Sequence, residues 1–380
     1  MALTIGVPAE AAPETRVAMV PASVAALQRV GARVLVERGA GMAAGYQDDA
    51  YTARGAEVAT AKAVWAADLV LRVRALEGVG GRVGRGTTLV GICNALYSPP
   101  ALREVAAAGA TVFALELMPR ITRAQSMDVL SSQATVAGYR AAVMAAAALP
   151  KLFPMLTTAA GTVAPARVLV VGAGVAGLQA IATARRLGAL VDAYDVRPAV
   201  KEQVQSLGAR FVELPLESAE GAGGYAQAQG AAFYARQQEL MAKVVAASDA
   251  VITTAAVPGQ AAPKLITRAM VEAMAPGSLI VDVAAEQGGN CELTRPGETV
   301  VHQGVTIIGN TNLPGTAPFH ASQLYAHNVA AFVASLVHDG ALTVDLTDEV
   351  TRETLVASAG EVTHPRVREA FGLKPLDAAA

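Results

Sequence analysis

Three glycines with a characteristic spacing, Gly172, Gly174 and Gly177, follow a run of β-branched residues and precede a helical pattern. In such a strand–turn–helix unit the first glycine permits the tight turn, the second lets the backbone approach a phosphate, and the third lets helix and strand pack closely. The N–H groups of the helix start would face the negative charge. The sequence therefore predicts that a dinucleotide pyrophosphate binds along Gly172, Ala173, Gly174, Val175, Ala176 and Gly177.

An acidic residue, Asp195, ends the next predicted strand, 23 residues after Gly172. A carboxylate at this position is expected to receive the ribose hydroxyls of the dinucleotide. Its negative charge would repel a 2′-phosphate, which favours NAD over NADP. Arg197 lies two residues further on and could accept such a phosphate, so NADP stays an alternative.

The elements that must position these residues alternate between strand and helix patterns over the 380 residues. Such alternation is typical of parallel sheets covered by helices. We expect an α/β fold with two Rossmann-like, doubly wound parallel-sheet domains, joined by two long crossing helices, with a cleft between the domains. The first domain would comprise residues 1–132 plus 339–380, the NAD(H)-binding Rossmann domain 150–318, and the connecting helices 133–149 and 319–338.

Apolar runs mark the expected strands. In the first domain, which carries no recognised dinucleotide fingerprint, they are 3–7, 33–37, 68–73, 88–92 and 111–115. In the second domain the strand before the glycines is followed by 190–194, 210–213, 249–253, 278–283 and 305–308. Residues 21–30 and 100–108 are expected helices, and the tail 343–371 would pack on the first domain or stay frayed.

Composition argues against several classes of protein. Hydrophobic residues make up 53% of the chain, but alanine supplies much of this, and the apolar stretches are too short to span a bilayer. The net charge is −2 with both signs interspersed, which leaves no footprint for nucleic acid. We recognise no signal peptide, and Cys93 and Cys291 lack metal-ligand spacing, so we expect reduced thiols, no metal and a cytoplasmic location.

A second group of polar residues lies in the run 119–133, between an apolar strand and the first long helix. Donors and acceptors suited to a carboxamide and its ribose come from Arg120, Gln125, Asp128 and Ser131. The alternative interpretation is a polar helix cap, with Ser131 or Ser132 capping the helix. Composition alone does not separate the two.

Several segments closely resemble one enzyme family, the NAD(H)-binding subunits of proton-translocating nicotinamide nucleotide transhydrogenases. They are residues 123–133 (RAQSMDVLSSQ), 171–180 (VGAGVAGLQA), 194–198 (YDVRP), 221–226 (GAGGYA) and 282–291 (DVAAEQGGNC). The resemblance covers nearly the whole chain, and the polar run is its most specific part. It implies that NAD(H) is the bound nucleotide.

The resemblance also implies roles for single residues. Arg120, Gln125, Asp128 and Ser131 would contact the nicotinamide end and form the catalytic set, and Asp195 would bind the adenosine ribose. Tyr225 would lie on a mobile loop that closes over the nucleotide. The predicted cofactor-binding set is completed by Val196, Arg197, Ala255 and Glu286.

Partners and location follow from the same resemblance. The chain would work with membrane-embedded subunits that carry the NADP(H)-binding domain, at the inner face of the plasma membrane. A homodimer is implied, with an exchanged hairpin around residues 152–165. The expected reaction is hydride transfer from NADH to NADP⁺ on a partner subunit.

Alanine dehydrogenase shares this fold and resembles the chain at residues 6–18, 71–74 and 281–289. A stand-alone amino-acid dehydrogenase is therefore the main alternative, with Arg16, Arg72 or Arg74 binding the substrate carboxylate. Where that family has its catalytic histidine, however, this chain has Cys93 and Asn94, and the catalytic aspartate corresponds to Glu286. A non-catalytic NAD(H) sensor is the third alternative.

The alternative functions differ in whether they need a catalytic general base, and the sequence offers no obvious one. Oxidation of an amine or alcohol releases a proton and needs a positioned base. All five histidines lie at or beyond residue 302, and only His320 is a reasonable candidate. Hydride transfer between two nicotinamide rings moves no proton and asks for apposition in a dry site. The residues therefore favour transhydrogenation.

Overall fold

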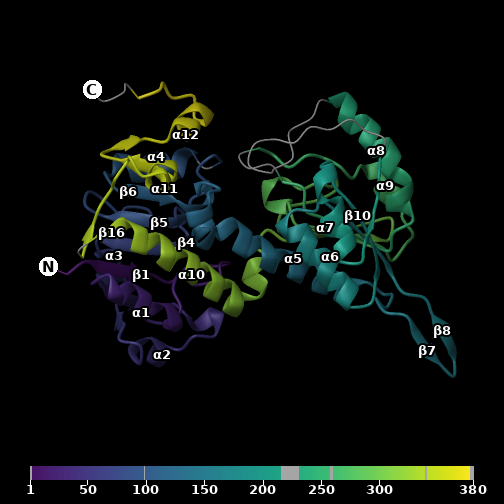
Figure 1. Ribbon diagram of the computed structural model, residues 1–380, viewed down its shortest axis with the longest axis horizontal. Coiled ribbons are helices and arrows are strands. Elements are labelled where there is room, and N and C mark those ends of the chain that lie inside the picture. The colour runs from purple at the N-terminus through teal and green to yellow at the C-terminus, as the bar shows by residue number, and fades with distance from the viewer. Residues whose placement is uncertain (1, 98, 215–230, 257–259, 339, 377–380) are drawn as a thin grey trace. The chain divides into compact units, whose positions relative to one another are not determined.

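The computed structural model describes residues 2–97, 99–214, 231–256, 260–338 and 340–376. The chain forms two compact units, Met1–Gln133 with Gly315–Ala380, and Ala134–Pro314, each built around one sheet (Figure 1). This confirms the predicted α/β class with parallel, Rossmann-like sheets. The predicted domain limits and the cleft stay predictions. Among the described residues, no helix combines the length and hydropathy that crossing a membrane requires.

The first unit contains an eight-stranded sheet in the order β19-β18-β6-β5-β4-β1-β2-β3. Its strands are β1 (Thr4–Val7), β2 (Arg33–Glu37), β3 (Glu57–Ala59), β4 (Leu69–Arg74), β5 (Thr88–Ile92), β6 (Thr111–Ala114), β18 (Leu355–Ser358) and β19 (Glu361–Val362). Strands β1 to β6 pair in parallel, whereas β18 pairs antiparallel with β6 and β19 antiparallel with β18. The C-terminal tail therefore extends this sheet.

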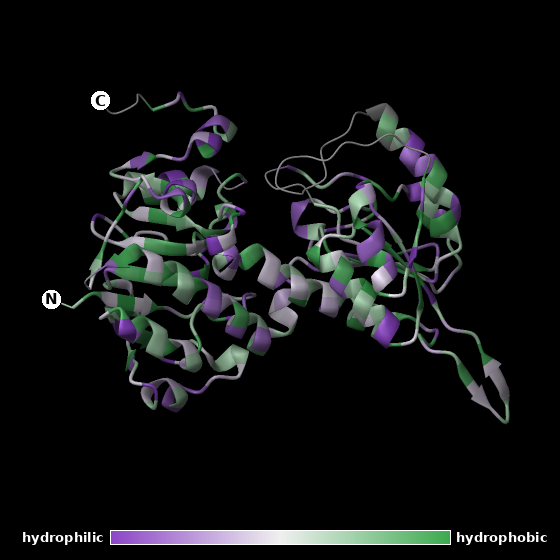
Figure 2. Ribbon diagram, viewed as in Figure 1, coloured by the Kyte–Doolittle hydropathy of each residue, from purple (hydrophilic) through white to green (hydrophobic). Residues whose placement is uncertain are grey.

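The central strands explain the apolar runs of the sequence. Nearly every residue of β4 and β5 is buried, as expected for parallel strands covered on both faces. The strands of this sheet are mostly apolar in Figure 2. Strand β3 was not predicted, because three half-exposed residues at a sheet edge leave no apolar run.

Helices cover this sheet. They are α1 (Pro21–Arg29), α2 (Asp48–Thr52), α3 (Ala61–Trp65), α4 (Pro99–Ala107), α10 (Pro318–Leu336), α11 (Glu349–Thr354) and α12 (Pro365–Ala370). The long helix α10 packs into the core of this unit through Tyr325, Val329 and Phe332, and Phe332 meets Phe113 edge to face with 5.5 Å between ring centroids. By its contacts α10 belongs to the first unit.

The second unit contains a seven-stranded sheet in the order β11-β10-β9-β12-β13-β15-β14. Its strands are β9 (Arg167–Val171), β10 (Leu190–Tyr194), β11 (Arg210–Phe211), β12 (Ala250–Thr253), β13 (Leu279–Asp282), β14 (Thr299–His302) and β15 (Val305–Ile308). All pair in parallel except the edge strand β14. Counted along the chain without β14, this is the 3-2-1-4-5-6 order of dinucleotide-binding folds, whose order reverses between β9 and β12.

The helices of the second unit are α6 (Val175–Arg186), α7 (Lys201–Ser206), α8 (Ala231–Ala246) and α9 (Arg268–Glu272). The long helix α5 (Val129–Ala148) begins in the first unit and continues in the second. A hairpin of β7 (Leu156–Thr158) and β8 (Gly161–Val163) extends from the body of the second unit, and every residue of its two strands is exposed (Figure 1).

Gly138 on α5 lets this helix approach the first turn of α6 within the second unit. A Cβ built on Gly138 would lie 2.0 Å from the carbonyl oxygen of Ala176. The obstacle is backbone and cannot swing aside as the end of a flexible side chain could. Because α6 directly follows the glycine turn, Gly138 fixes how closely α5 packs beside that turn.

Replacing Gly138 with alanine should lower the free energy of unfolding by about 1–3 kcal/mol, the usual cost of overpacking, although alanine favours helices. Urea denaturation measures the change. Gly80→Ala is the control, because a Cβ there meets nothing within 4 Å and the substitution should be neutral or slightly stabilising. Equal losses in the two variants would contradict this role of Gly138.

Candidate functional site

The glycine turn after β9 has the geometry that the sequence predicts. Gly172 adopts a φ of +98°, and a Cβ on it would lie 2.6 Å from Thr254 Oγ1. A Cβ on Gly177 would lie 1.9 Å from the carbonyl oxygen of Gly172. A Cβ on Gly174 would meet nothing within 4 Å. The protein itself therefore requires the first and third glycines, while the second faces open space of the kind a phosphate needs.

Helix α6 begins at the same turn. Gly174 is its N-cap residue, and no side chain caps the helix. The first N–H groups of a helix have no intrahelical partner, and together with the helix dipole they attract an anion. With twelve residues, α6 is long enough for a substantial dipole. The start of α6, from Gly174 to Gly177, thus presents backbone N–H groups suited to an anion, beside the switch point of the sheet.

Asp195, at the carboxyl end of β10, braces this turn. Its side chain is only 6% exposed, and its Oδ2 accepts the backbone N–H of Ala173 at 2.7 Å. Its Oδ1 accepts the backbone N–H of Arg197 at 2.9 Å. The Arg197 guanidinium donates one hydrogen bond to each carboxylate oxygen, both at 2.9 Å. The predicted ribose-binding carboxylate therefore also holds the glycine turn and is paired with the neighbouring arginine.

Two buried residues that the sequence analysis missed shape the neighbouring loops. Asn290, fully buried, accepts the N–H of Ala255 at 3.0 Å and donates to the carbonyl oxygens of Ala255 and Pro263 at 2.7 and 2.9 Å. Asp282, at the end of β13, accepts the N–H groups of Ala284 and Cys291 and the hydroxyl of Thr294. The segment DVAAEQGGNC contains both residues, but its pattern does not reveal which backbone groups they bind.

The other residues that we predict to contact the nucleotide are less buried than Asp195. Val196 is half-buried after β10, Ala255 follows β12, and Glu286 is exposed on the short 3-10 helix η6 (Ala285–Gln287). Tyr225 lies outside the described residues. Hydrogen bonds thus join Asp195 to the glycine turn and Arg197 to Asp195. The nucleotide contacts of all these residues stay predictions.

The polar run forms the 3-10 helix η3 (Thr122–Met127) and then enters α5. Asp128 caps that helix, because its carboxylate accepts the backbone N–H of Ser131 at 2.9 Å and the Ser131 hydroxyl at 2.6 Å. The sequence alternative of a helix cap therefore holds for Asp128, not for Ser131 or Ser132. Arg120 and Gln125 are exposed. Capping does not exclude a second role, so the nicotinamide contacts of these four residues stay predictions.

A glycine pair that the sequence analysis overlooked, Gly39 and Gly41, follows β2 with the spacing of the same motif. A Cβ on Gly41 would lie 2.7 Å from the carbonyl oxygen of Tyr46 and 2.8 Å from the ring of Tyr51. Protein atoms thus fill the space that Gly174 leaves open. Only the 3-10 helix η1 (Met42–Ala44) follows, so this turn is structural.

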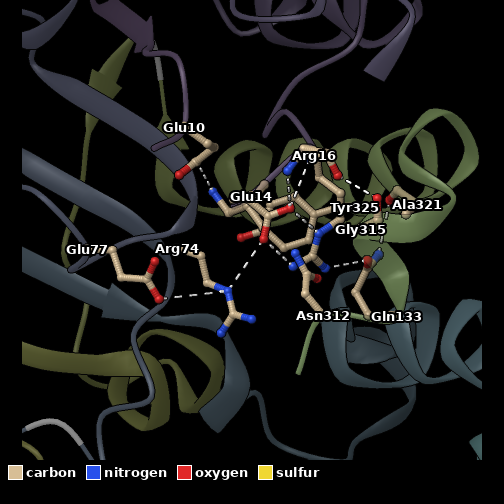
Figure 3. Close-up of polar contacts among 12 residues, drawn as sticks. Glu10, Glu14, Arg16, Arg74, Glu77, Gln133, Asn312, Gly315, Ala321 and Tyr325 are labelled. Carbon is tan, nitrogen blue, oxygen red and sulfur yellow. Dashed lines mark hydrogen bonds and ion pairs between the residues drawn. The ribbon is translucent and has the colours of Figure 1, made fainter. Parts of the chain in front are cut away.

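The arginines of the alternative function lie in a buried ion-pair network in the first unit (Figure 3). Arg16 pairs with Glu14 at 2.7 Å, and the two side chains are 4% and 2% exposed. Arg74 reaches the same carboxylate at 3.5 Å, and Arg72 pairs with Glu10 at 2.6 Å. Each arginine that could bind a substrate carboxylate therefore already faces a glutamate.

The same network fixes the start of α5. Arg16 Nη1 donates to Gln133 Oε1 at 2.8 Å, and Gln133 Nε2 donates to the carbonyl oxygen of Ala321 at 3.1 Å (Figure 3). Glu14 thus stabilises, through Arg16, the helix that Asp128 caps. Burial alone would raise the pKa of Glu14, but hydrogen bonds from Arg16 and its charge outweigh burial and lower this pKa from 4.5 to about 2.

A carboxyl whose pKa is lowered by folding contributes stability above its unfolded pKa and loses it as the pH falls through the folded value. Glu14 should therefore stabilise the chain by about 1–3 kcal/mol at neutral pH, and this contribution should fade between about pH 4.5 and 2. Urea denaturation of wild type and Glu14→Gln should give a difference that shrinks across this range. Glu57→Gln, in a half-exposed pair with Arg33, is the control with little effect. A Glu14→Gln difference that is constant with pH would contradict the pairing.

The glycine turn gives two opposed variants. Gly174→Ala should leave the free energy of unfolding nearly unchanged, because its Cβ enters open space, yet weaken NADH binding at least about tenfold by obstructing the phosphate. Gly177→Ala should destabilise the free protein, because its Cβ meets the backbone of Gly172. Fluorescence titration with NADH and urea denaturation separate the two effects. Normal NADH affinity in Gly174→Ala would place the pyrophosphate elsewhere.

Known proteins share this architecture over the whole chain. Residues 6–137 match the family described as alanine dehydrogenase/PNT, N-terminal domain, and residues 141–365 match alanine dehydrogenase/PNT, C-terminal domain. The first part of the NAD(P) transhydrogenase alpha subunit of Rhodospirillum rubrum is 47% identical over an alignment of 377 positions that covers 96% of this chain and 98% of that protein. Alanine dehydrogenase of Bacillus subtilis is 29% identical, over 97% of this chain and 95% of that enzyme.

The solved structures agree with the sequences. The crystal structure of a transhydrogenase from Sinorhizobium meliloti has a TM-score of 0.86 and 44% identity, and covers 94% of this chain and 99% of that one. These findings confirm the resemblance that the polar run and the glycine turn carry. The chain belongs to the alanine dehydrogenase/PNT family, and within it is more similar to these transhydrogenase alpha subunits than to the Bacillus alanine dehydrogenase.

Proposed function

We propose that this chain is the NAD(H)-binding subunit of a proton-translocating transhydrogenase and passes hydride from NADH to NADP⁺ held by a partner subunit. The observation that carries this proposal is the open glycine turn Gly172–Gly177, which is braced by a buried carboxylate and is the one turn of this strand–turn–helix kind that we find among the described residues. The similar turn at Gly39 and Gly41 is filled by protein. A chain that binds one nucleotide needs a neighbour to supply the other.

The nucleotide-binding residues have distinct roles in this proposal. The N–H groups from Gly174 to Gly177 bind the pyrophosphate, while the N–H of Ala173 stays on Asp195. The carboxylate of Asp195 accepts the adenosine ribose hydroxyls with its remaining lone pairs. Val196, Ala255 and Glu286 line the remaining nucleotide surface. Bound NADH supplies the hydride from its nicotinamide ring.

The polar run orients the reacting end. Arg120, Gln125 and Ser131 direct hydrogen bonds to the carboxamide and its ribose, while Asp128 holds Ser131 through the cap of α5. Because the transfer moves no proton, this set needs orientation and dryness in place of a base.

The nature of the partners follows from the resemblance to the transhydrogenase family. Membrane-embedded subunits would carry the NADP(H) domain, and this chain would associate with them at the inner face of the plasma membrane. The name of the Rhodospirillum relative, which describes it as one portion of an alpha subunit, supports a multi-subunit assembly.

A homodimer is part of the proposal, and its support comes from the hairpin of β7 and β8. Around this hairpin Leu152 is 50% exposed, Met155 62%, Leu156 42% and Val163 44%. Large apolar side chains that project from a unit into solvent are typical of a segment that a second subunit covers. A second copy of the chain, exchanging the hairpin, would bury them.

Rapid mixing of the NADH-loaded chain with NADP⁺-loaded partner subunits tests the function. Asp128→Asn should slow hydride transfer about 10- to 100-fold while NADH affinity changes less than about threefold. Asparagine can still accept the Ser131 N–H and cap the helix, but it offers an N–H group in place of the oxygen that accepts the Ser131 hydroxyl, so Ser131 loses its orientation. Gln125→Asn should behave alike, since the shorter amide cannot reach the same position. Ser126→Ala, exposed on the same 3-10 helix, is the control that should transfer normally.

The outcomes separate the three functions. The isolated chain with NAD⁺ and L-alanine should form no NADH, and steady turnover there would establish an amino-acid dehydrogenase. Transfer that needs the partner supports the proposal. NADH binding without transfer to any partner would leave a sensor. Equal losses of affinity and rate in Asp128→Asn would mean that Asp128 only holds the loop.

A further inference from the structure

Arg197 is held in an unusually complete contact with Asp195. Its backbone N–H, its Nε and one terminal nitrogen all donate to that carboxylate, each at 2.9 Å. The side chains are 14% and 6% exposed, so solvent screens the pair weakly. The site where a dinucleotide places its adenosine ribose therefore contains a fixed positive charge that its own carboxylate neutralises.

A guanidinium at this place in a Rossmann fold is the group that accepts the 2′-phosphate of NADP(H). Its planar fork matches phosphate oxygens well. In this chain the fork is aligned on Asp195, two residues away, and the carboxylate adds a repulsive negative charge. The two residues together thus determine which dinucleotide the site takes.

We propose that Arg197 is a specificity-determining residue, a latent binding group for a 2′-phosphate that Asp195 keeps neutralised. This inference rests on the proposed function, because it concerns the same nucleotide site. Asp195 excludes NADPH in two ways, by repelling the phosphate and by occupying the arginine that would bind it. A subunit that supplies hydride from NADH needs such exclusion. If NADPH occupied this site, hydride would pass from NADPH to NADP⁺ and no net transfer between the two kinds of nucleotide would occur.

The substitution that tests this is Asp195→Asn. An amide oxygen can still accept the N–H of Ala173, so the glycine turn keeps its brace. The negative charge is lost, and Arg197 keeps its place beside the ribose. NADPH affinity should rise at least about tenfold, as a charge-assisted phosphate contact allows, while NADH affinity falls. Fluorescence titration with each reduced nucleotide measures both.

A double variant identifies the arginine as the source of the gain. Asp195→Asn with Arg197→Gln should lose the added NADPH affinity. Asp195→Asn with Arg186→Gln is the matched control, because it removes the same charge from the exposed last turn of α6, at the opposite end of that helix. This control should keep the gain. The proposal is wrong if the two double variants bind NADPH equally well, or if Asp195→Asn gains none.

Arg197→Gln alone provides a test that leaves Asp195 and its contact with Ala173 in place. With its neutralising partner removed, the carboxylate should repel the 2′-phosphate more strongly, and the ratio of NADH to NADPH affinity should rise about tenfold. An unchanged or lower ratio would overturn the inference. If the wild-type chain failed to bind NADH, that separate result would contradict the proposed function and not this inference.

Discussion

The buried hydrogen bond from Ala173 N–H to the Asp195 carboxylate is the contact on which the nucleotide site depends. It ties the glycine turn after β9 to the end of the neighbouring strand β10, so the backbone from Ala173 to Gly177 has one defined shape. A buried carboxylate needs several donors to offset its lost hydration, and Arg197 supplies the others. The side chain of Asp195 therefore holds the glycine turn, neutralises Arg197 and sets the nucleotide selectivity that we propose.

A second buried charge network gives the first unit a comparable constraint. Glu14 is shared by Arg16 and Arg74, and Arg16 extends the contact to Gln133 at the start of α5. Removing one partner of a buried pair leaves an uncompensated charge, so these groups depend on one another. The network holds the helix whose first turn Asp128 caps. The ion pairs of Glu14 with Arg16 and Arg74 therefore stabilise the first unit and also fix the position of the polar run.

Much of the fold could be predicted because buried parallel strands are continuous apolar runs, as in β4 and β9, and because three glycines in order specify one kind of turn. The short edge strand β3 has no such signal. Long-range contacts were also out of reach: nothing in the sequence shows that Asp195 accepts the N–H of Ala173, that Arg197 is paired, or that Asn290 braces Ala255. Local spacing suggested Ser131 or Ser132 as the cap of α5, whereas Asp128 takes that role by accepting the backbone N–H of Ser131.

Crystals of the protein soaked with NADH would show whether the nucleotide binds at the glycine turn that Asp195 braces. We expect pyrophosphate oxygens on the N–H groups at the start of α6 and adenosine ribose hydroxyls on Asp195, with Gly174 in contact with phosphate. A nucleotide bound away from this turn, or a ribose that does not touch Asp195, would contradict it.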